Sequence, residues 1–358
     1  MKEPSKGQGM TVGLDLGDRF SHLVVIDEQG QVVEEGRIAT SEVALRQRFS
    51  GCPPMRIALE TGTHSPWVSR VLEECGHEVV VANSRKLRLI YENPSKDDRV
   101  DALYLARLGR VDPALLSPVQ HRGATAQKDL ALLRSRDALV CARTQLINHV
   151  RGLVKSLGSR LPGCSSRAFP QRASEKAPES LRLGLVPVLE EIASLNDRIK
   201  TLDRQIERLA QESYPETKLL RQVPGVGPIT SLAFVLTLEA PQRFPKSRTV
   251  GAFLGLVPGR KQSGDSDPQR RITKHGDSSV RRLLVNAAHY ILGPFGSDSN
   301  LRRFGAKIAS RGGKNAKKRA IVAVARKLAV LLHHLWRSCE VYEPLYQTQK
   351  ANRGGKVA

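Results

Sequence analysis

The sequence is short of aromatic residues and of cysteine, and each shortage argues against a class of protein. Phe, Trp and Tyr make up 4% of its 358 residues, which leaves few side chains on which nucleic-acid bases could stack. The five cysteines are scattered without a Cys-x-x-Cys pair, so we expect a cytosolic protein with neither a zinc site nor a disulfide framework. No apolar run is long enough to span a membrane, and no signal peptide is recognisable.

Acidic residues are also in deficit, and the deficit is uneven. Lys and Arg number 57 against 35 Asp and Glu, for a formal charge of +22. Residues 1–110 hold 15 basic and 16 acidic side chains, whereas residues 241–358 hold 24 and 6. A basic second half predicts a polyanion as partner, most simply nucleic acid. Binding to a membrane surface is the alternative, but no long basic amphipathic helix with aromatic anchors supports it.

Short apolar runs alternate with helical patterns in the first third of the chain, which predicts an α/β domain with a mixed sheet covered by helices. The predicted strands are Thr11–Leu16, Leu23–Asp27, Val32–Ile38, Arg56–Glu60 and Glu78–Ala82. The predicted helices are Ser41–Phe49, Pro66–Cys75 and Val100–Leu108.

The middle of the chain is predicted to be a helical connector. Residues 126–158 have a helical pattern, and residues 159–180, with Pro, Gly and Ser, are expected to be a loop. Further on, apolar residues alternate steps of three and four, as in a coiled-coil seam, at Ile192, Leu195, Ile199, Leu202, Ile206 and Leu209. The simpler alternative is one helix packed on a neighbouring helix of the same chain. Either arrangement gives a connector that could also serve as an oligomerisation surface.

The last part of the chain is predicted to be mainly helical. Pro224-Gly225-Val226-Gly227 joins two apolar stretches, which fits a helix-hairpin-helix whose second helix start offers N–H groups to a phosphate. An ordinary helical hairpin is the alternative. A polar, Gly-rich loop over Gly259–Gly276 precedes helices predicted at Ser278–Leu292 and Ala316–Trp336.

A chain of this length is too long for one ordinary core, so we expect two folded domains, a connector and flexible tails. The predicted segments are 1–9 (tail), 10–115 (α/β domain), 116–215 (helical connector), 216–345 (helical domain) and 346–358 (tail).

Four acidic residues are the candidates for a metal site. Asp15 lies inside an apolar strand, and Glu60 ends another strand before a Thr-Gly-Thr turn. Asp98 and Asp101 are three residues apart, so on a helix they share a face. Four oxygen donors of this kind suit Mg²⁺ or Mn²⁺. Two such ions about 4 Å apart can assist a displacement at phosphorus.

Other interpretations of these acids are open. Asp98 and Asp101 alone fit a solvated helix N-terminus, where acids offset the helix dipole. Asp97 is one step off the face that they share. Asp15-Leu16-Gly17 also resembles the phosphate-binding hairpin of sugar kinases and actin-like ATPases, but a second phosphate loop of the Asp-Gly-Gly type is missing from the sequence.

Three motifs taken together resemble one family. Gly-Leu-Asp-Leu-Gly-Asp, Leu-Glu-Thr-Gly-Thr and Lys-Asp-Asp-Arg-Val-Asp-Ala are similar to the DEDD transposases of insertion sequences, the insertion-sequence one-hundred-and-ten family. Pro-Gly-Val-Gly-Pro, Gly-Leu-Val-Pro and Val-Arg-Arg-Leu-Leu extend the resemblance over nearly the whole chain. The resemblance implies an RNase H-like (RuvC-like) domain whose four acidic residues are Asp15, Glu60, Asp98 and Asp101. The family usually has Thr where Asp97 stands.

A serine follows in the loop Gly255-Leu-Val-Pro-Gly-Arg-Lys-Gln-Ser-Gly264. A serine hydroxyl needs activation to act as a nucleophile, and the histidine His275 is distant in the sequence. Arg and Lys near the serine could hold a phosphate. The resemblance implies that Ser263 attacks DNA and forms a phosphoserine link, with Ser266 as the alternative. The residues expected to contact nucleic acid are Gly225, Gly227, Arg260, Lys261, Arg270, Arg271, Lys274, Arg281 and Arg282.

The resemblance implies a DNA transposase that moves its own insertion element, with Mg²⁺ or Mn²⁺ as cofactor. It also implies a homo-oligomer (dimer or tetramer), a structured guide RNA that pairs with donor and target DNA, and a composite active site. Such a protein belongs to the bacterial cytoplasm, associated with the nucleoid and with no membrane partner. The alternatives are a metal-dependent junction resolvase that cuts with activated water, and a non-catalytic nucleic-acid scaffold with a degenerate acidic site.

Overall fold

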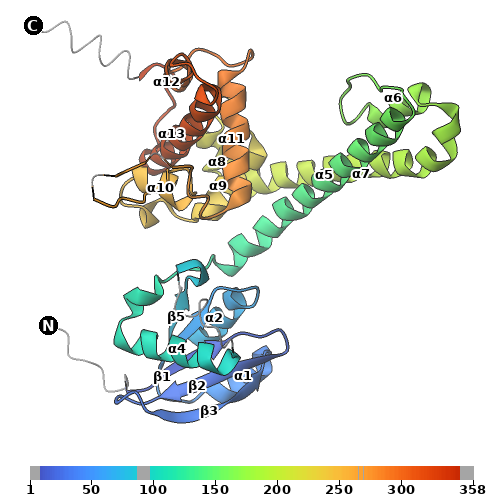
Figure 1. Ribbon diagram of the computed structural model, residues 1–358. Helices are drawn as coiled ribbons and strands as arrows, with labels where there is room; N and C mark the ends of the chain where they lie inside the picture. The colour runs from blue at the N-terminus through green and yellow to red at the C-terminus, as the bar shows by residue number, and fades with distance from the viewer. Residues whose placement is uncertain (1–8, 87–96, 265, 269, 347–358) are drawn as a thin grey trace, which may run out of the picture. The chain divides into compact units, whose positions relative to one another are not determined.

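The computed structural model describes residues 9–86, 97–264, 266–268 and 270–346. The chain divides into two compact units, Met1–Ala124 and Thr125–Ala358, each with hydrophobic clusters of its own (Figure 1). Nearly all of the two predicted tails, 1–9 and 346–358, lies outside the described residues. The finer division into α/β domain, connector and helical domain stays a prediction.

The first unit is built on a five-stranded mixed sheet with the strand order β3-β2-β1-β4-β5. Its strands are β1 Thr11–Asp15, β2 Phe20–Ile26, β3 Val32–Ala39, β4 Arg56–Glu60 and β5 Glu78–Ala82. The first three strands pair antiparallel, and β4 and β5 extend the sheet in parallel with β1. All five predicted strands are confirmed, with ends that shift by at most three residues.

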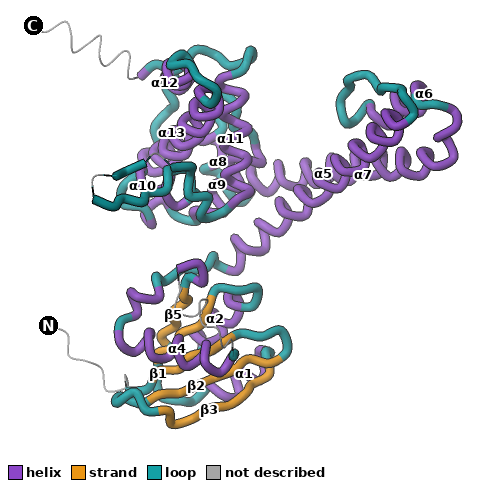
Figure 2. The backbone as a smooth tube through the Cα atoms, in the orientation of Figure 1, coloured by secondary structure: helices purple, strands orange, loops and turns teal. Residues whose placement is uncertain are grey.

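Helices cover both faces of this sheet (Figure 2). On one face, α1 Glu42–Phe49 and α2 Ser65–Glu74 pack on Val12 and Leu14 of β1, which are fully buried. On the other face, α4 Asp98–Val111 packs on β1, β2 and β4. Two 3₁₀ helices complete the described part of this unit, η1 Ser84–Lys86 and η2 Pro113–Leu116. The α/β fold predicted for this part of the chain is confirmed, and the central strands β1 and β4, covered on both faces, make a rigid support.

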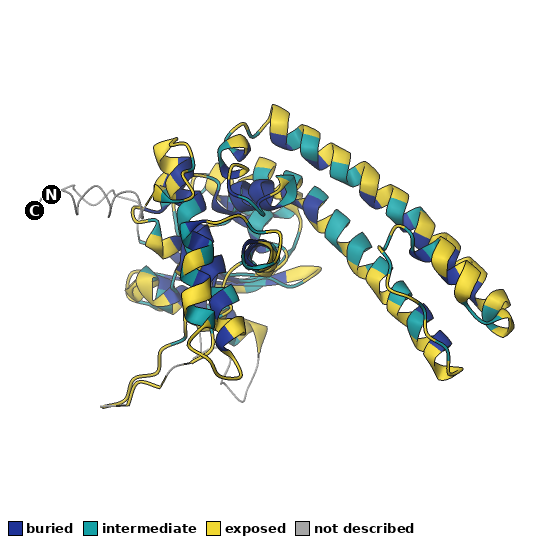
Figure 3. Cartoon of the chain, turned by 90° about the horizontal axis from the view of Figure 1, so that it is seen from above, coloured by how far each residue is buried: buried dark blue, intermediate teal, exposed yellow. Residues whose placement is uncertain are grey.

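Two long helices of the second unit, α5 Ala124–Ser156 and α7 Arg182–Glu212, lie side by side and run antiparallel (Figures 1 and 3). Arg136 Nε donates to Asp203 Oδ1 at 2.7 Å, and Arg143 Nη1 donates to Asn196 Oδ1 at 2.8 Å. Burial recurs along α7 at Ile192, Leu195, Ile199 and Ile206. The apolar residues that predict a seam therefore pack within the same chain, and a role in oligomerisation stays a prediction.

The prediction of a loop over residues 159–180 is wrong in part. A helix, α6 Phe169–Lys176, and the 3₁₀ helix η3 Glu179–Leu181 form within it. Phe169 and Ala173 are 1% exposed, in a cluster with residues of α5 and α7. A two-turn helix has too few residues to show a hydrophobic period, so tertiary packing and not the local pattern decides its structure.

The rest of the second unit is helical and surrounds α9 Pro228–Leu238, in which every residue from Thr230 onward is buried. A helix that is apolar all round is a core helix. The other elements are α8 Thr217–Leu220, η4 Pro241–Arg243, α10 Arg248–Phe253, α11 Ser278–Leu292, α12 Asn300–Ala309 and α13 Ala316–Ser338. The two helices predicted near the C-terminus are confirmed as α11 and α13. None of the helices in the described part of the chain has both the length and the apolar character of a membrane span.

Candidate active site

Asp15 and Glu60 end two neighbouring parallel strands. β1 and β4 pair in parallel with Leu14 opposite Leu59. The next residues, Asp15 and Glu60, therefore lie beside each other at the carboxyl edge of the sheet. Side chains alternate along a strand, so Asp15 belongs to the face of Gly13 and Glu60 to the face of Ala58. Both acids are half-buried. Two carboxylates from distant parts of the sequence therefore lie at one edge and on one face of the sheet.

The helix α4 packs directly on the backbone of that face. A Cβ atom built on Gly13 would lie 1.8 Å from the carbonyl oxygen of Ala102. Two turns further along α4, a Cβ built on Gly109 would lie 3.6 Å from Cγ2 of Thr11. The helix therefore runs antiparallel to β1, and its first turn lies toward the carboxyl end of that strand.

The first turn of α4 carries the other two acids to the same end of the sheet. Asp101 is 7% exposed, so its carboxylate faces the protein, whereas Asp98 is exposed. The carboxylate of Asp97 instead caps the helix and accepts a hydrogen bond from the N–H of Arg99. Asp97 therefore stabilises the start of α4 as its N-cap, a role that requires no metal.

The four acids supply the oxygen donors that a hard divalent cation prefers. Among the described residues, no three or more His, Cys, Asp or Glu side chains are grouped closely enough to hold a metal ion. Carboxylates repel one another unless a cation lies between them, so ligation requires these side chains to rotate toward a shared ion. The backbone already places them at one edge, and in that sense the residues fit the cation. The assignment of metal ligands stays a prediction.

A histidine that was not among the predicted site residues, His64, lies on the loop after β4, near Asp18 on the loop after β1. His64 Nε2 is 3.5 Å from Asp18 Oδ1, and Trp67 Nε1 donates to His64 Nδ1 at 3.1 Å. With Nδ1 as acceptor, the neutral ring carries its proton on Nε2, facing the Asp18 carboxylate. The only signal in the sequence was its position four residues after Glu60.

Ser263 lies at the tip of an irregular hairpin in the second unit. Its backbone N–H donates to the carbonyl of Ser266 at 3.1 Å, and the N–H of Ser266 donates back at 3.1 Å. Further down, the N–H of Gly259 donates to the carbonyl of Arg271 at 2.9 Å. His275 lies at the base, where the packing against Gly255 is tight. The two pairings between base and tip separate His275 from Ser263, so the structure provides no histidine as activator within the hairpin.

The basic residues that were predicted to contact nucleic acid divide into two groups. Lys261, Arg270, Arg271 and Lys274 are exposed and have no carboxylate partner among the described residues. Arg260 is 3.4 Å from Asp267 in an exposed ion pair, which contributes little and is easily exchanged.

The other two predicted contacts have internal partners. Arg281 Nη1 donates to the carbonyls of Leu254 and His275, at 3.0 and 2.8 Å, and so holds the base of the hairpin. Arg282 forms an ion pair with Asp137 of α5. Their contact with nucleic acid stays a prediction, but the structure gives both a role within the unit.

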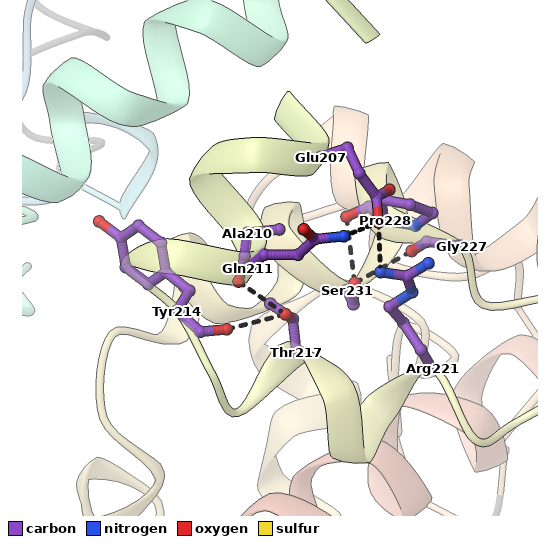
Figure 4. Close-up of polar contacts among 9 residues, drawn as sticks. All are labelled: Glu207, Ala210, Gln211, Tyr214, Thr217, Arg221, Gly227, Pro228 and Ser231. Carbon is purple, nitrogen blue, oxygen red and sulfur yellow. Dashed lines mark hydrogen bonds and ion pairs between the residues drawn. The ribbon is translucent and has the colours of Figure 1, made fainter. Parts of the chain in front are cut away.

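The glycine turn is packed differently at its two glycines. Gly225 has φ +88°, and a Cβ built there would lie 3.1 Å from the carbonyl of Ala287 in α11, whereas a Cβ on Gly227 would meet open space. The helix-hairpin-helix is not confirmed, because α8 before the turn is only four residues long. Polar contacts join α7 to the segment of α8 before the turn, whereas Ser231 of α9 donates to carbonyls of Gly227 and Pro228 at the start of its own helix (Figure 4). Among them, Arg221 Nη1 lies 2.7 Å from Glu207 Oε1.

Comparison with known proteins finds transposases of insertion sequences. Residues 12–158 match the DEDD transposase family of IS110 elements, and residues 217–305 match the "Transposase IS116/IS110/IS902 family". The chain is 27% identical to the transposase for insertion sequence element IS1111A of Coxiella burnetii, over 92% of this chain and 90% of that protein. It is also 27% identical to the transposase for insertion sequence element IS1328 of Yersinia enterocolitica, over 77% of this chain and 82% of that protein.

The mixed sheet with acids at its carboxyl edge is consistent with an RNase H-like domain of the DEDD type. The chain belongs to the DEDD-type transposases of the IS110 family. It is therefore an insertion-sequence transposase, and its substrate is DNA. Transposases of the DEDD type typically use a divalent metal.

Proposed function

We propose that this transposase cuts and rejoins DNA through an ester between the Ser263 hydroxyl and a DNA phosphate, assisted by Mg²⁺ or Mn²⁺ on Asp15, Glu60, Asp98 and Asp101. The observation that carries the proposal is the placement of acids from two strands and one helical turn at a single edge of the sheet. The exposed tip position of Ser263 supports it, because a DNA phosphate can approach the hydroxyl there.

The proposed reaction exchanges one phosphate ester for another. A bond forms between Ser263 Oγ and phosphorus, and the bond from phosphorus to the neighbouring nucleoside oxygen breaks. The serine hydroxyl releases a proton and the leaving oxygen takes one up. Rejoining reverses these steps with the hydroxyl of another DNA end, so no external energy source is needed. Bound metal would stabilise negative charge at the phosphate, and Lys261 and Arg271 are exposed cations that can neutralise it from the hairpin.

The choice of DNA sequence is proposed to come from a structured guide RNA in a homo-oligomeric complex. Base pairing with donor and target DNA would move sequence recognition out of the protein. The low aromatic content and the basic second half of the chain support backbone contacts over contacts to bases.

The test is a search for a protein–DNA adduct that survives denaturant, using the full chain, labelled donor DNA and Mg²⁺. We expect the native protein to form the adduct and Ser263→Ala to abolish it, because the ester oxygen is removed. Ser266→Ala is the matched control, since Ser266 pairs with Ser263 across the hairpin and should leave the adduct intact. Asp15→Ala should prevent adduct formation with the serine present. If an RNA guides the reaction, RNase treatment should lower the amount of adduct.

A nuclease that cuts by activated water is the second candidate. One observation favours it, because Ser263 has no side-chain hydrogen bond among the described residues to take up its proton. Metal-dependent cleavage without any adduct, unaffected by Ser263→Ala, would replace the serine proposal with this one.

A further inference from the structure

The C-terminal end of the second unit contains a long segment without acidic residues. Between Asp298 and Glu340 the chain has no Asp or Glu and eleven Lys or Arg. The segment spans α12, the turn after it and α13, two helices that pack against each other. Almost all of it lies beyond residue 305, where the second family match ends. Neither the matched families nor the proposed reaction therefore assigns these cations a role.

Some of the cations in this segment have structural roles. Arg302 Nη1 donates to the carbonyls of Ile291 and Gly293, at 2.7 and 2.6 Å. Lys327 lies over the ring of Phe304, with Nζ 4.2 Å from the ring centroid. These contacts fasten α12 and α13 to their neighbours and account for both side chains without any ligand.

Two more cations are also accounted for. Arg303 forms a two-oxygen contact with Asp298, with Nη2 2.6 Å from Oδ2. Arg337 Nη1 donates to the carbonyl of Pro245 at 2.5 Å.

Of the seven cations that remain, Arg326 lies in the middle of α13 beside Gly251, and six gather where α12 ends and α13 begins. They are Lys307, Arg311, Lys314, Lys317, Lys318 and Arg319, all exposed, and none has an ion pair or hydrogen bond from its side chain among the described residues. They occupy the last turn of α12, the connecting turn and the first turn of α13. We call residues 307–319 the α12–α13 basic turn. Six like charges gathered at one end of a helix pair repel one another, so a bound anion would stabilise the arrangement.

The backbone of the α12–α13 basic turn is also open to a ligand. Gly312 and Gly313 have φ +75° and +87°, and a Cβ built on either would meet nothing within 4 Å. Asn315 precedes α13 without a side-chain cap. The first N–H groups of a 23-residue helix are thus left without a capping side chain, on the same turn as the cations.

We propose that the α12–α13 basic turn binds the phosphate backbone of duplex DNA, independently of sequence. The inference rests on the proposed function in taking DNA as the substrate, and adds a contact surface separate from the serine hairpin. Single-stranded nucleic acid is bound on exposed aromatic rings, whereas Phe304 is covered by Lys327 and Trp336 is 8% exposed. Neither aromatic ring on α12 and α13 is in the exposed class, and cations without exposed rings on their own helices suit phosphate contacts, which carry no sequence information.

The test compares DNA affinity of the full chain before and after four cations are neutralised. The variant is Arg311→Gln/Lys314→Gln/Lys317→Gln/Lys318→Gln, and the probe is a labelled DNA duplex of random sequence in a salt titration. Each phosphate contact contributes about 0.9 to the slope of log K against log salt. If all four cations contact phosphates, we expect the slope to become shallower by about 3.6 and the affinity at about 100 mM salt to fall at least about tenfold.

The matched control removes the same charge elsewhere in the second unit. Lys155, Lys200, Arg204 and Arg208 are exposed on α5 and α7, and their replacement by Gln should leave the affinity within about twofold of the native value. A charge-retaining variant, Arg311→Lys/Lys314→Arg/Lys317→Arg/Lys318→Arg, should also bind as the native protein does. Equal melting temperatures exclude misfolding as the cause.

Three results would overturn the inference: unchanged affinity in the neutralised variant, an equal loss in the control, or tighter binding of an RNA duplex of the same sequence. The Ser263→Ala variant separates this inference from the proposed reaction, because it should bind the duplex normally. If no adduct forms but the neutralised variant still loses affinity, the serine mechanism fails and the DNA contact stands.

Discussion

The acidic edge of the first unit and the serine hairpin of the second are built in opposite ways. The acids sit on strands and a helix whose backbones touch, with Gly13 directly beneath the carbonyl of Ala102. Ser263 sits at an exposed tip that is closed by one pair of reciprocal backbone hydrogen bonds. Metal ligands need positions held within a fraction of an ångström, which a packed sheet provides. A nucleophile that must reach a large polyanion needs access, which a projecting hairpin provides.

This contrast predicts where mutations are tolerated. At Gly13, beside the acids, backbone packing leaves no room for even one added methyl group. Around the serine, side chains are exposed and few contacts are lost on substitution. Electrostatics differ as well, since negative charge gathers at the acidic edge, whereas positive charge gathers on the hairpin and on the α12–α13 basic turn.

The largest expected effect is the loss of stability in Gly13→Ala, which disrupts the packing of α4 on β1. The new methyl group would overlap the Ala102 carbonyl, 1.8 Å away, and must push α4 off the sheet. We expect a destabilisation of about 3 kcal/mol or more, at the upper end of overpacking effects. Trp67 and Trp336, one in each unit, are the two tryptophans, so denaturant unfolding of Trp336→Phe proteins reports on the first unit alone.

Gly36→Ala is the control for that measurement. Gly36 also lies in a strand of the same sheet, but a Cβ there would meet nothing within 4 Å. It should change stability by less than about 1 kcal/mol. Equal effects of the two substitutions would show that close packing of α4 on β1 does not hold the acidic edge.

A smaller effect is expected on metal affinity, and it should differ between two acids at the start of α4. Asp101 is buried toward the sheet, whereas Asp97 caps the helix. Asp101→Asn should weaken Mn²⁺ binding, measured by calorimetry, by at least about 100-fold, since even groups that only support a ligand are worth 10–100-fold. Asp97→Asn removes the same charge and should leave the affinity nearly unchanged. A similar loss in both would mean that the metal responds to net charge and not to the acidic edge.

The smallest expected effect concerns the core of the second unit at low pH. Buried His333 lies 2.9 Å from both Ser247 Oγ and the carbonyl oxygen of Pro241, and burial is the main cause that lowers its pKa. Because the folded pKa is below the unfolded value of about 6.5, the unfolded chain takes up the proton first. The stability that neutral His333 contributes is therefore complete above about pH 6.5 and lost as pH falls through the lower folded pKa.

Unfolding followed by Trp336 in a Trp67→Phe background measures this loss. The variant His333→Gln should be less stable at neutral pH but should lose less stability on acidification. His121 in the first unit also has a pKa lowered mainly by burial, so His121→Gln serves as a control that should not alter the response of Trp336. An unchanged pH dependence in His333→Gln would assign the acid sensitivity to other groups.

The sequence predicted the sheet well because its strands are short apolar runs bounded by turns, as in Arg56–Glu60 and Glu78–Ala82. It also predicted the helix that carries Asp98 and Asp101, although that helix begins two residues earlier than expected. It failed at α6, where eight residues fold on the faces of α5 and α7. It could not show that the Arg281 guanidinium also donates to backbone carbonyls, because no sequence pattern reveals such a contact, and its predicted contact with nucleic acid stays a prediction.

What the sequence by itself determined is therefore local: alternating and helical periods, the order of acidic motifs, and the excess of cations near the C-terminus. Tertiary structure alone decided which of those residues meet. Asp15 and Asp101 come to one edge because α4 crosses β1 antiparallel over a glycine. The six cations of the α12–α13 basic turn have no ion pair because no carboxylate of the described residues packs beside them. The reason is that hydrogen bonding and periodicity act between near neighbours, whereas close packing and charge pairing depend on distances set by the whole fold.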